Sequence, residues 1–223
     1  MRLLAIETAT EACSAALFVN GEASERYEVI PRGHGDLLLP MIDELMAAAE
    51  LHPQQLDGIA FGRGPGAFTG LRIAASVTQG IAFGADLPVV PVSTLATLAQ
   101  GAFRTSGRES LLTAIDARMG EVYWGAFHIV ETQARLVGEE CVAAPTEVSC
   151  LDGHDWYGCG TGWASYENAL NQRYAGTLQG VVDHHLPHAR DVATLALPRL
   201  AAGDVISAEQ AIPVYLRDRV VME

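Results

Sequence analysis

The sequence predicts an α/β protein of two lobes, in which each lobe carries a mixed sheet flanked by helices. Short apolar runs of strand length alternate with longer amphipathic segments, which is the pattern of α/β folds. An N-terminal series of strand, polar turn and strands returns in the second half of the chain and indicates two lobes of related topology. At 223 residues the chain is long enough to bury a core in each lobe. We assign the lobes to residues 1–103 and 104–223 and allow a late helix to pack back on the first lobe.

The first lobe opens with a strand, a polar turn and two further strands. A tight turn at Asn20-Gly21 favours a hairpin between the second and third of these strands. Their expected ranges are Leu3–Ile6, Cys13–Val19 and Glu22–Val29. This opening resembles that of the actin-like/Hsp70/sugar-kinase (ASKHA) fold, in which an Asp in the first turn approaches a nucleotide phosphate. Glu7 takes that position here, followed by Thr8; the alternative is that the threonines of the turn only satisfy backbone groups.

The same arrangement restarts after a polar segment, Arg104–Glu109, which we take as the boundary between the lobes. A strand at Leu111–Ile115 is followed by a turn that begins with Asp116, and then by a strand at Glu121–Ile129. A second glycine loop lies at Gly158–Gly162. The remaining elements expected of this half are a strand at 135–142 and helices at 163–173 and 192–202.

A glycine-rich loop joins a buried strand to a helix in the first lobe. The strand is expected at Leu56–Phe61, and the helix at Gly70–Phe83 with Thr69 as its N-cap and Gly84 at its end. Such a loop directs free amides and the positive end of a helix dipole at one point, which suits an anion. The alternative is that the glycines only permit a tight turn, since a glycine motif alone is weak evidence. The residues of this candidate nucleotide or anion cleft are Glu7, Thr8, Gly64, Gly66, Thr69, Gly70 and, from the second lobe, Asp116.

Two successive helices carry more apolar surface than one sheet face requires. In the helix expected at Gly33–Glu50, acidic residues form one narrow stripe and apolar residues cover the rest. The helix at Gly70–Phe83 has no charged residue between Arg72 and Asp86. We therefore expect a protein–protein interface on these two helices. Its predicted residues are Leu38, Met41, Ile42 and Leu45 of the first helix and Ile73, Val77 and Ile81 of the second.

Charge and residue usage exclude several classes of function. A net charge of −13 argues against a surface that binds nucleic-acid phosphates by itself. All 14 basic residues are arginine, which excludes a P-loop lysine and a Schiff-base mechanism. The 4 cysteines lack a paired metal spacing, and we expect buried thiols. Because neither a signal peptide nor an unbroken run of membrane-spanning length is evident, we expect a reduced, cytoplasmic protein without membrane contact.

No catalytic constellation emerges from the sequence. His184 and His188 stand four apart, but Pro187 interrupts the helix that such a metal-binding pair would need. Asp116 and Glu121 flank a turn, where acidic residues are common without any catalytic role. We predict no catalytic residue and no metal site.

Several segments, spread over nearly the whole chain, resemble the TsaB (YeaZ) family in order and spacing. Each segment alone is unspecific, whereas the set is highly specific. The family's usual GPGSFTG reads GPGAFTG here, so Ala67 removes a hydroxyl near the candidate anion site. The segments are AIETATEACSAAL, HGDLLLPMIDEL, GRGPGAFTGLRIAASVTQGIAFG, PVSTLATLAQGA, AIDARMGEVYWG, GCGTGW and PVYLRD.

The resemblance implies the actin-like fold and a non-catalytic subunit. That subunit binds and activates TsaD, its catalytic sister of the same fold, when N6-threonylcarbamoyladenosine is formed at position 37 of tRNAs decoding codons that begin with A. The P-loop ATPase TsaE is the further partner that the resemblance implies, with a homodimer when the chain is alone. The tRNA is then contacted only indirectly, and we expect no cofactor beyond weak ATP or ADP binding within the complex.

The resemblance also bears on the metal and on the interface. In TsaD an Asn-His-x-x-x-His sequence after the fifth strand helps to hold a metal, and Thr94 and Leu98 stand in the places of its histidines here. The helices through which the family contacts TsaD correspond to the two helices with surplus apolar surface.

Two other functions compete with this interpretation. A free-standing actin-like ATPase or kinase would use Glu7–Thr10, Asp116–Gly120 and Gly158–Gly162, and would bind nucleotide with magnesium by itself. A peptidase, an older label on the wider family, needs a nucleophile or a metal that the sequence does not offer.

Overall fold

The computed structural model describes residues 1–151, 153, 155–183 and 186–217, and these form two compact units. The first unit comprises Met1–Thr97 and Pro187–Val214, and the second comprises Leu98–Leu186 with the residues from Tyr215 onward. The chain thus passes from the first unit to the second within a helix, after Thr97, whereas the sequence placed this boundary at residue 103. Residues 187–214, which the sequence assigned to the second lobe apart from one late helix, pack with the first sheet instead.

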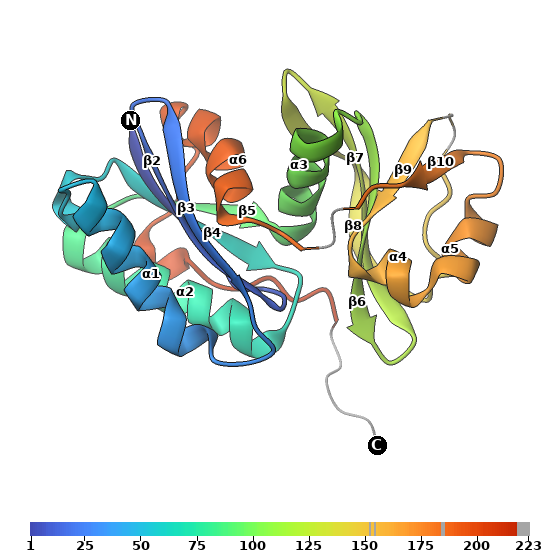
Figure 1. Ribbon diagram of the computed structural model, residues 1–223, viewed down its shortest axis with the longest axis horizontal. Helices are drawn as coiled ribbons and strands as arrows, with labels where there is room; N and C mark the ends of the chain where they lie inside the picture. Colours follow the sequence, from blue (N-terminus) through green and yellow to red (C-terminus); the bar gives the residue numbers. More distant parts are fainter. Residues whose placement is uncertain (152, 154, 184–185, 218–223) are drawn as a thin grey trace. The chain divides into compact units, whose positions relative to one another are not determined.

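The first unit is built on a five-stranded mixed sheet (Figure 1). Its order is β3-β2-β1-β4-β5, with β2 antiparallel to both β1 and β3, and with β4 and β5 parallel to β1. The hairpin turn at Asn20 and Gly21 has positive φ angles of 53° and 98°, as the sequence predicts. The strands are β1 (Arg2–Glu7), β2 (Ala12–Val19), β3 (Glu22–Val29), β4 (Gly58–Gly64) and β5 (Val89–Ser93).

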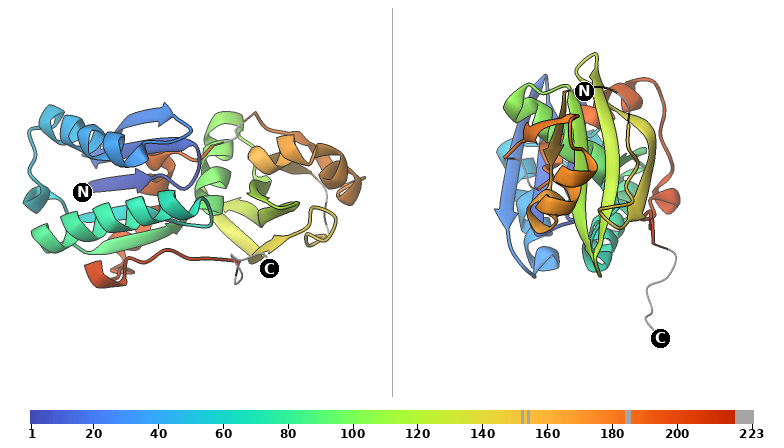
Figure 2. Two further views of the ribbon diagram at one scale, coloured as in Figure 1. Left: turned by 90° about the horizontal axis from the view of Figure 1, so that it is seen from below. Right: turned by 90° about the vertical axis from the view of Figure 1, so that its right-hand side faces the viewer.

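Helices cover both faces of this first sheet. The helices α1 (His34–Ala48) and α2 (Phe68–Ala85) lie side by side on one face and share its core (Figure 2). The helix α6 (Ala189–Ala201) packs on the other face, against β1, β2, β4 and β5. Two 3-10 helices, Pro53–Gln55 and Ala208–Gln210, complete the unit, and the second of them packs beside α2.

Both ends of α2 differ from the prediction. The helix begins at Phe68 after Ala67, so Thr69 lies inside its first turn and is not the N-cap. It also runs through Gly84 to Ala85, and the residue that caps it, Asp86, has a left-handed φ of 53°. Asp86 takes this conformation in place of a glycine, as Asp and Asn do more readily than other residues.

The second unit repeats the topology of the first. Its sheet has the order β10-β9-β6-β7-β8, with β7 antiparallel to both β6 and β8, and with β9 and β10 parallel to β6. The strands are β6 (Ser110–Arg118), β7 (Glu121–Val130), β8 (Gln133–Ala143), β9 (Trp156–Cys159) and β10 (Leu178–Val181). The repeated order of five mixed strands confirms the predicted actin-like fold.

The sequence missed β9 and β10 and predicted one helix where two exist. Both strands have 4 residues and contain a glycine, so they give no strand periodicity. The helix expected at 163–173 is α4 (Thr161–Ser165) followed by α5 (Glu167–Arg173), separated by Tyr166, whose φ of −131° and ψ of 33° are not helical. Trp163, Leu170 and Tyr174 of this region pack into the core of the second sheet.

The helix α3 (Thr94–Ser106) starts after Ser93, whose hydroxyl accepts hydrogen bonds from the amides of Leu95 and Ala96. Its Gln100 is bound to the second sheet by hydrogen bonds of 2.9 Å to the Thr132 carbonyl and from the Ala134 amide. In the part of the chain that the structure describes, no helix combines the length and apolar character that crossing a membrane would require.

Candidate functional site

The first turn after β1 carries a fully buried carboxyl group, that of Glu7. One oxygen accepts a hydrogen bond of 2.7 Å from the Ala9 amide, and the other lies 3.3 Å from the Thr94 hydroxyl at the start of α3. Burial raises the pKa of Glu7 to about 7, although hydrogen bonds from Ala9, Thr94 and Thr8 oppose the rise. No cation contributes to this pKa, so the Glu7 carboxyl changes between its protonated and its ionised form near neutral pH.

The glycines of the loop after β4 make room for oxygen atoms of the protein itself. A Cβ atom at Gly62 would collide with the Glu7 carboxyl, and one at Gly66 would collide with the Ala9 carbonyl oxygen. At Gly64, where φ is +108°, a Cβ atom would lie 2.8 Å from the Val214 carbonyl oxygen. These glycines are needed for close internal packing, and the groups that they face are hydrogen-bond acceptors.

The same holds for the start of α2. A Cβ atom at Gly70 would collide with the Thr8 carbonyl oxygen, and the Thr8 hydroxyl donates a hydrogen bond of 2.8 Å to the Gly70 carbonyl. The Ala67 amide donates to the Ala9 carbonyl at 2.7 Å. A phosphate needs donors at such a site, and here acceptors from the first turn fill the approach to the loop. Within the first unit, the tight-turn explanation of the glycines fits better than the anion site.

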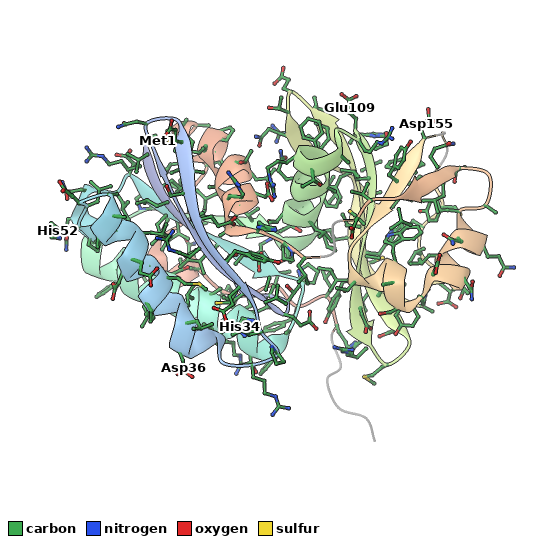
Figure 3. All side chains as sticks on the ribbon, in the orientation of Figure 1. Met1, His34, Asp36, His52, Glu109 and Asp155 are labelled. Carbon is green, nitrogen blue, oxygen red and sulfur yellow. The ribbon has the colours of Figure 1, made fainter. Side chains whose placement is uncertain are left out.

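The threonines of the first turn also serve the backbone. The Thr10 hydroxyl accepts a hydrogen bond of 3.2 Å from the Ala12 amide, and the Thr10 carbonyl lies 2.9 Å from Nε2 of the buried His34 on α1. His34 is a residue that the sequence analysis did not select. Figure 3 marks it together with Asp36, which is exposed on the same helix.

Asp116 of the second unit is held by its own neighbours. Its carboxyl accepts hydrogen bonds from the Arg118 amide at 2.8 Å, the Arg118 guanidinium at 3.0 Å and the Tyr166 hydroxyl at 3.2 Å. Glu121, on the other side of the turn, forms an ion pair with Arg217. The two acids therefore have separate partners, and the turn does not present them as a catalytic carboxylate pair.

The positions that correspond to the metal-binding histidines of TsaD are closed. Thr94 is fully buried and bound to Glu7, and Leu98 is fully buried as well. Among the described residues, no three His, Cys, Asp or Glu side chains are grouped so that they could hold a metal ion. His184 lies outside the described residues, whereas His188 stacks on Tyr27 at 4.0 Å.

The cysteines are all free, but the expectation of four buried thiols is wrong for Cys150, which is exposed. Cys141 is partly exposed, while Cys13 and Cys159 are buried. Burial raises the pKa of the Cys13 thiol to about 11, so this thiol stays protonated and is a poor nucleophile.

The apolar residues predicted for the outer face of α1 lie in the core. Leu38, Met41, Ile42 and Leu45 are between 0% and 8% exposed and pack against the sheet with α2. They are not surplus, because α1 contacts β2 and β3 and also α2, and so needs a broad apolar face. Leu45 and its neighbours therefore cannot contact a partner while the unit stays folded.

The residues predicted on α2 are placed differently. Ile73, Val77 and Ile81 are partly exposed and lie at the margin of the core. One flank of α2 is further covered by the segment after α6, since the Gln79 amide donates to the Ala211 carbonyl at 3.1 Å. This internal cover explains part of the missing charge on α2.

A different set of apolar and small residues forms the outer surface of the two helices. Leu39 of α1 is 50% exposed, and Phe68 and Phe83 of α2 are 47% and 76% exposed. Between the two phenylalanines, Gly80 is exposed and a Cβ atom there would meet no atom within 4 Å. We name Leu39, Phe68, Phe83, Gly80, Ile73, Val77 and Ile81 the α1–α2 face.

The sequence contains a signal for the one α1 residue of this face. Asp36 and Asp43 mark the solvent side of α1, and Leu39 lies between them at helical spacing. The number of apolar residues on α1 does not show which of them face solvent. The positions of Asp36 and Asp43 around the helix do show it, because Leu39 lies on the same side.

Comparisons with known proteins agree with this architecture. The family model described as "TsaD: tRNA N6-adenosine threonylcarbamoyltransferase" matches residues 26–223. A relative in Escherichia coli K12, named tRNA threonylcarbamoyladenosine biosynthesis protein TsaB, is 41% identical over 99% of this chain and 96% of its own length. The protein of that name in Haemophilus influenzae is 39% identical over 99% of this chain and 95% of its own length.

A solved structure is similar over the same extent. The structure of YeaZ from Pseudomonas aeruginosa superposes with a TM-score of 0.90 and 49% identity, covering 96% of this chain and 99% of that one. The fold and these matches define a protein of the actin-like class related to the tRNA threonylcarbamoyltransferases. Within that class, the chain belongs to the TsaB (YeaZ) family.

Proposed function

We propose that this chain is a non-catalytic partner subunit that binds and activates a TsaD-type transferase. The reaction is the formation of N6-threonylcarbamoyladenosine at position 37 of tRNAs that decode codons beginning with A. Its relatives are named for the biosynthesis of this nucleoside, which supports the pathway.

The observation that carries the non-catalytic role is the filling of the glycine loop. Where this fold class brings amide donors to a phosphate, the chain has the Glu7 carboxyl against Gly62, the Thr8 carbonyl against Gly70 and the Ala9 carbonyl against Gly66. The Glu7 carboxyl beside the loop repels a phosphate when it is ionised and offers it no positive charge when it is neutral, and the chain has no lysine to supply one. In our proposal no catalytic residue, metal or resident cofactor belongs to this subunit, and ATP or ADP binds weakly at most, within the complex.

The partner surface that we propose is the α1–α2 face. Exposed aromatic and aliphatic side chains are typical of the central part of an interface, and arginine is enriched there as well. The guanidinium of Arg72 lies 3.8 Å from the centre of the Phe68 ring, so this face combines apolar groups with a cation. Gly80 adds a place where another helix can approach closely, since a Cβ atom there would meet no atom of the described residues within 4 Å. The same face would also serve a homodimer when the chain is alone. In this proposal a TsaE-type ATPase is a further partner, and the net charge of −13 leaves tRNA contact to the other subunits.

The test places one charge in the α1–α2 face and one elsewhere. Phe83→Asp introduces an unpaired carboxylate where Phe83 is 76% exposed, so the free subunit should stay folded while a dry interface is disrupted. We expect affinity for a TsaD-type partner to fall by about 100-fold or more, which corresponds to about 3 kcal/mol. Titration of the purified partner by calorimetry measures this loss.

The matched control is Met119→Asp, because Met119 is 61% exposed on the second unit. It adds the same charge to a surface outside the α1–α2 face, so its affinity should equal that of the wild type. Equal affinities for all three proteins would move the interface away from α1 and α2 without excluding a partner role.

The alternative function, a free-standing actin-like ATPase or kinase, predicts a tight nucleotide site in this chain. Our proposal predicts no heat of binding for ATP or ADP with magnesium at micromolar protein. A dissociation constant below about 1 μM, or about −8 kcal/mol, for the isolated chain would favour the alternative.

A further inference from the structure

Glu7 occupies a point where three parts of the first unit meet. It ends β1, its carboxyl contacts Gly62 on β4, and it reaches Thr94 at the start of α3. Thr94 directly follows β5. The strands β1, β4 and β5 are parallel to one another, so their carboxyl ends lie along one edge of the sheet. In open α/β sheets this edge is where functional groups gather. The proposed partner role assigns nothing to this carboxyl.

A chain of direct contacts leads from the carboxyl to the start of α2. Glu7 Oε1 accepts from the Ala9 amide at 2.7 Å, and the Ala9 carbonyl accepts from the Ala67 amide at 2.7 Å. Gly66 lies so close to Ala9 that a Cβ atom would collide with it. The turn cannot move without disturbing the residues that start the helix.

Burial favours the protonated carboxyl at this place, the hydrogen bonds from Ala9, Thr94 and Thr8 favour the ionised one, and burial is the larger effect. When it is neutral, its hydroxyl can donate to the Thr94 oxygen at 3.3 Å while Oε1 keeps the Ala9 amide. When it is ionised, a fully buried charge remains without a cation, and opening the turn to water relieves that cost. Burial raises the pKa of Glu7 to about 7, so both forms are accessible near neutral pH.

Ionisable groups on the surrounding elements do not cause the raised pKa of Glu7. Arg63 lies on β4, His34 starts α1, and His188 and Asp191 lie at the start of α6. None of them is among the causes of the raised pKa, which are burial and the hydrogen bonds from Ala9, Thr94 and Thr8.

We propose that Glu7 is a proton-dependent latch that holds the first turn and the start of α2 closed when its carboxyl is protonated and loosens both when the proton leaves. The latch consists of Glu7, Ala9, Gly66 and Ala67, all within the first unit. It does not depend on what binds the α1–α2 face, although it acts on the first turn of a helix in that face.

The experiment follows the carboxyl and the two amides in the same sample by NMR between pH 5 and 9. We expect the Glu7 carboxyl to titrate near pH 7 and the Ala9 and Ala67 amide resonances to shift with the same midpoint. After correction for intrinsic exchange, deuterium exchange at Ala67 should rise about tenfold from pH 6 to pH 8, as for an opening that releases one proton.

Two variants separate the latch from other titrations. Glu7→Gln keeps an acceptor for Ala9 and a donor for Thr94 without a titrating group, so exchange at Ala67 should become independent of pH. Glu22→Gln, which neutralises an exposed carboxyl on β3, should behave like the wild type. An Ala67 amide that stays unchanged while the Glu7 carboxyl titrates would overturn the latch. A carboxyl midpoint below pH 5 would do so too, and both results come from wild-type protein even if Glu7→Gln does not fold.

Discussion

The first turns of the two units have the same place in the topology, but the acidic residue beside each turn has different surroundings. Each turn joins the first two strands of an antiparallel meander and comes after an acid near the end of the first strand, Glu7 in the first unit and Asp116 in the second. Glu7 is fully buried and bound only by uncharged donors. Asp116 keeps a side chain that is 15% exposed and forms an ion pair with Arg118. A duplicated fold therefore fixes where the acid lies, while its surroundings decide how deeply it is buried and which groups it binds.

The surroundings differ because of what packs over each turn. In the first unit the glycine loop after β4 closes directly on Glu7, Thr8 and Ala9. In the second unit the turn bends through Arg118, Met119 and Gly120, which all have positive φ, and it ends in solvent. Close packing favours the uncharged acid, and exposure allows an ion pair that costs little to keep.

The two turns should differ most in the stability that is lost when a glycine packed against the turn or within it is replaced by alanine. In Gly70→Ala the new Cβ atom collides with the Thr8 carbonyl oxygen, so the backbone must shift, at a cost of about 3 kcal/mol or more. Gly120→Ala meets no atom within 4 Å and pays only for its φ of +79°, about 1 kcal/mol. Urea unfolding of both variants measures the two losses. Equal losses would mean that the glycine loop is not closed on the first turn.

A smaller effect is expected from pH. The pKa of Glu7 is about 7 in the folded chain against an ordinary value of 4.5, so the folded state holds the proton more tightly. The stability that this proton contributes is fully present below pH 4.5 and is lost as the pH rises through 7, a change of about 3 kcal/mol. In Glu7→Gln this loss should vanish, which urea unfolding at pH 5 and pH 8 will show. An unchanged pH dependence in the variant would mean that other groups cause it.

The smallest effect should come from the ion pair of the second unit. Removing the guanidinium in Arg118→Ala should cost less than about 1 kcal/mol, because that side chain is 75% exposed and its pair with Asp116 is screened. Unfolding in low and high salt measures the loss. A cost above 2 kcal/mol would show that the two turns are more alike than their burial indicates.

The sequence predicted the fold well because its signals are local. The hairpin turn at Asn20 and Gly21 appears where these residues indicate. The sequence also selected Glu7 as the residue of the first turn. It could not predict the burial of Glu7, because the groups that bury it come from Gly62 on β4 and Thr94 on α3, distant along the chain.

The predicted interface shows the opposite failure. An apolar count cannot tell a helix that contacts a sheet and a second helix from one that contacts a sheet and a partner. Leu38 and Leu45 therefore seemed surplus although they are core residues. Only the phase of the acidic stripe through Asp36 and Asp43 carries the orientation, and it selects Leu39.

Omission of this chain from a reconstituted reaction tests whether it is a non-catalytic subunit that activates a TsaD-type transferase. A TsaD-type transferase, a TsaE-type ATPase and threonylcarbamoyl adenylate are combined with unmodified tRNA, and the modified nucleoside is measured by mass spectrometry. We expect product only when this chain is added to the transferase, little product with Phe83→Asp, and none from this chain alone. Modified tRNA formed by the chain without the transferase, or formed equally well in its absence, would contradict it.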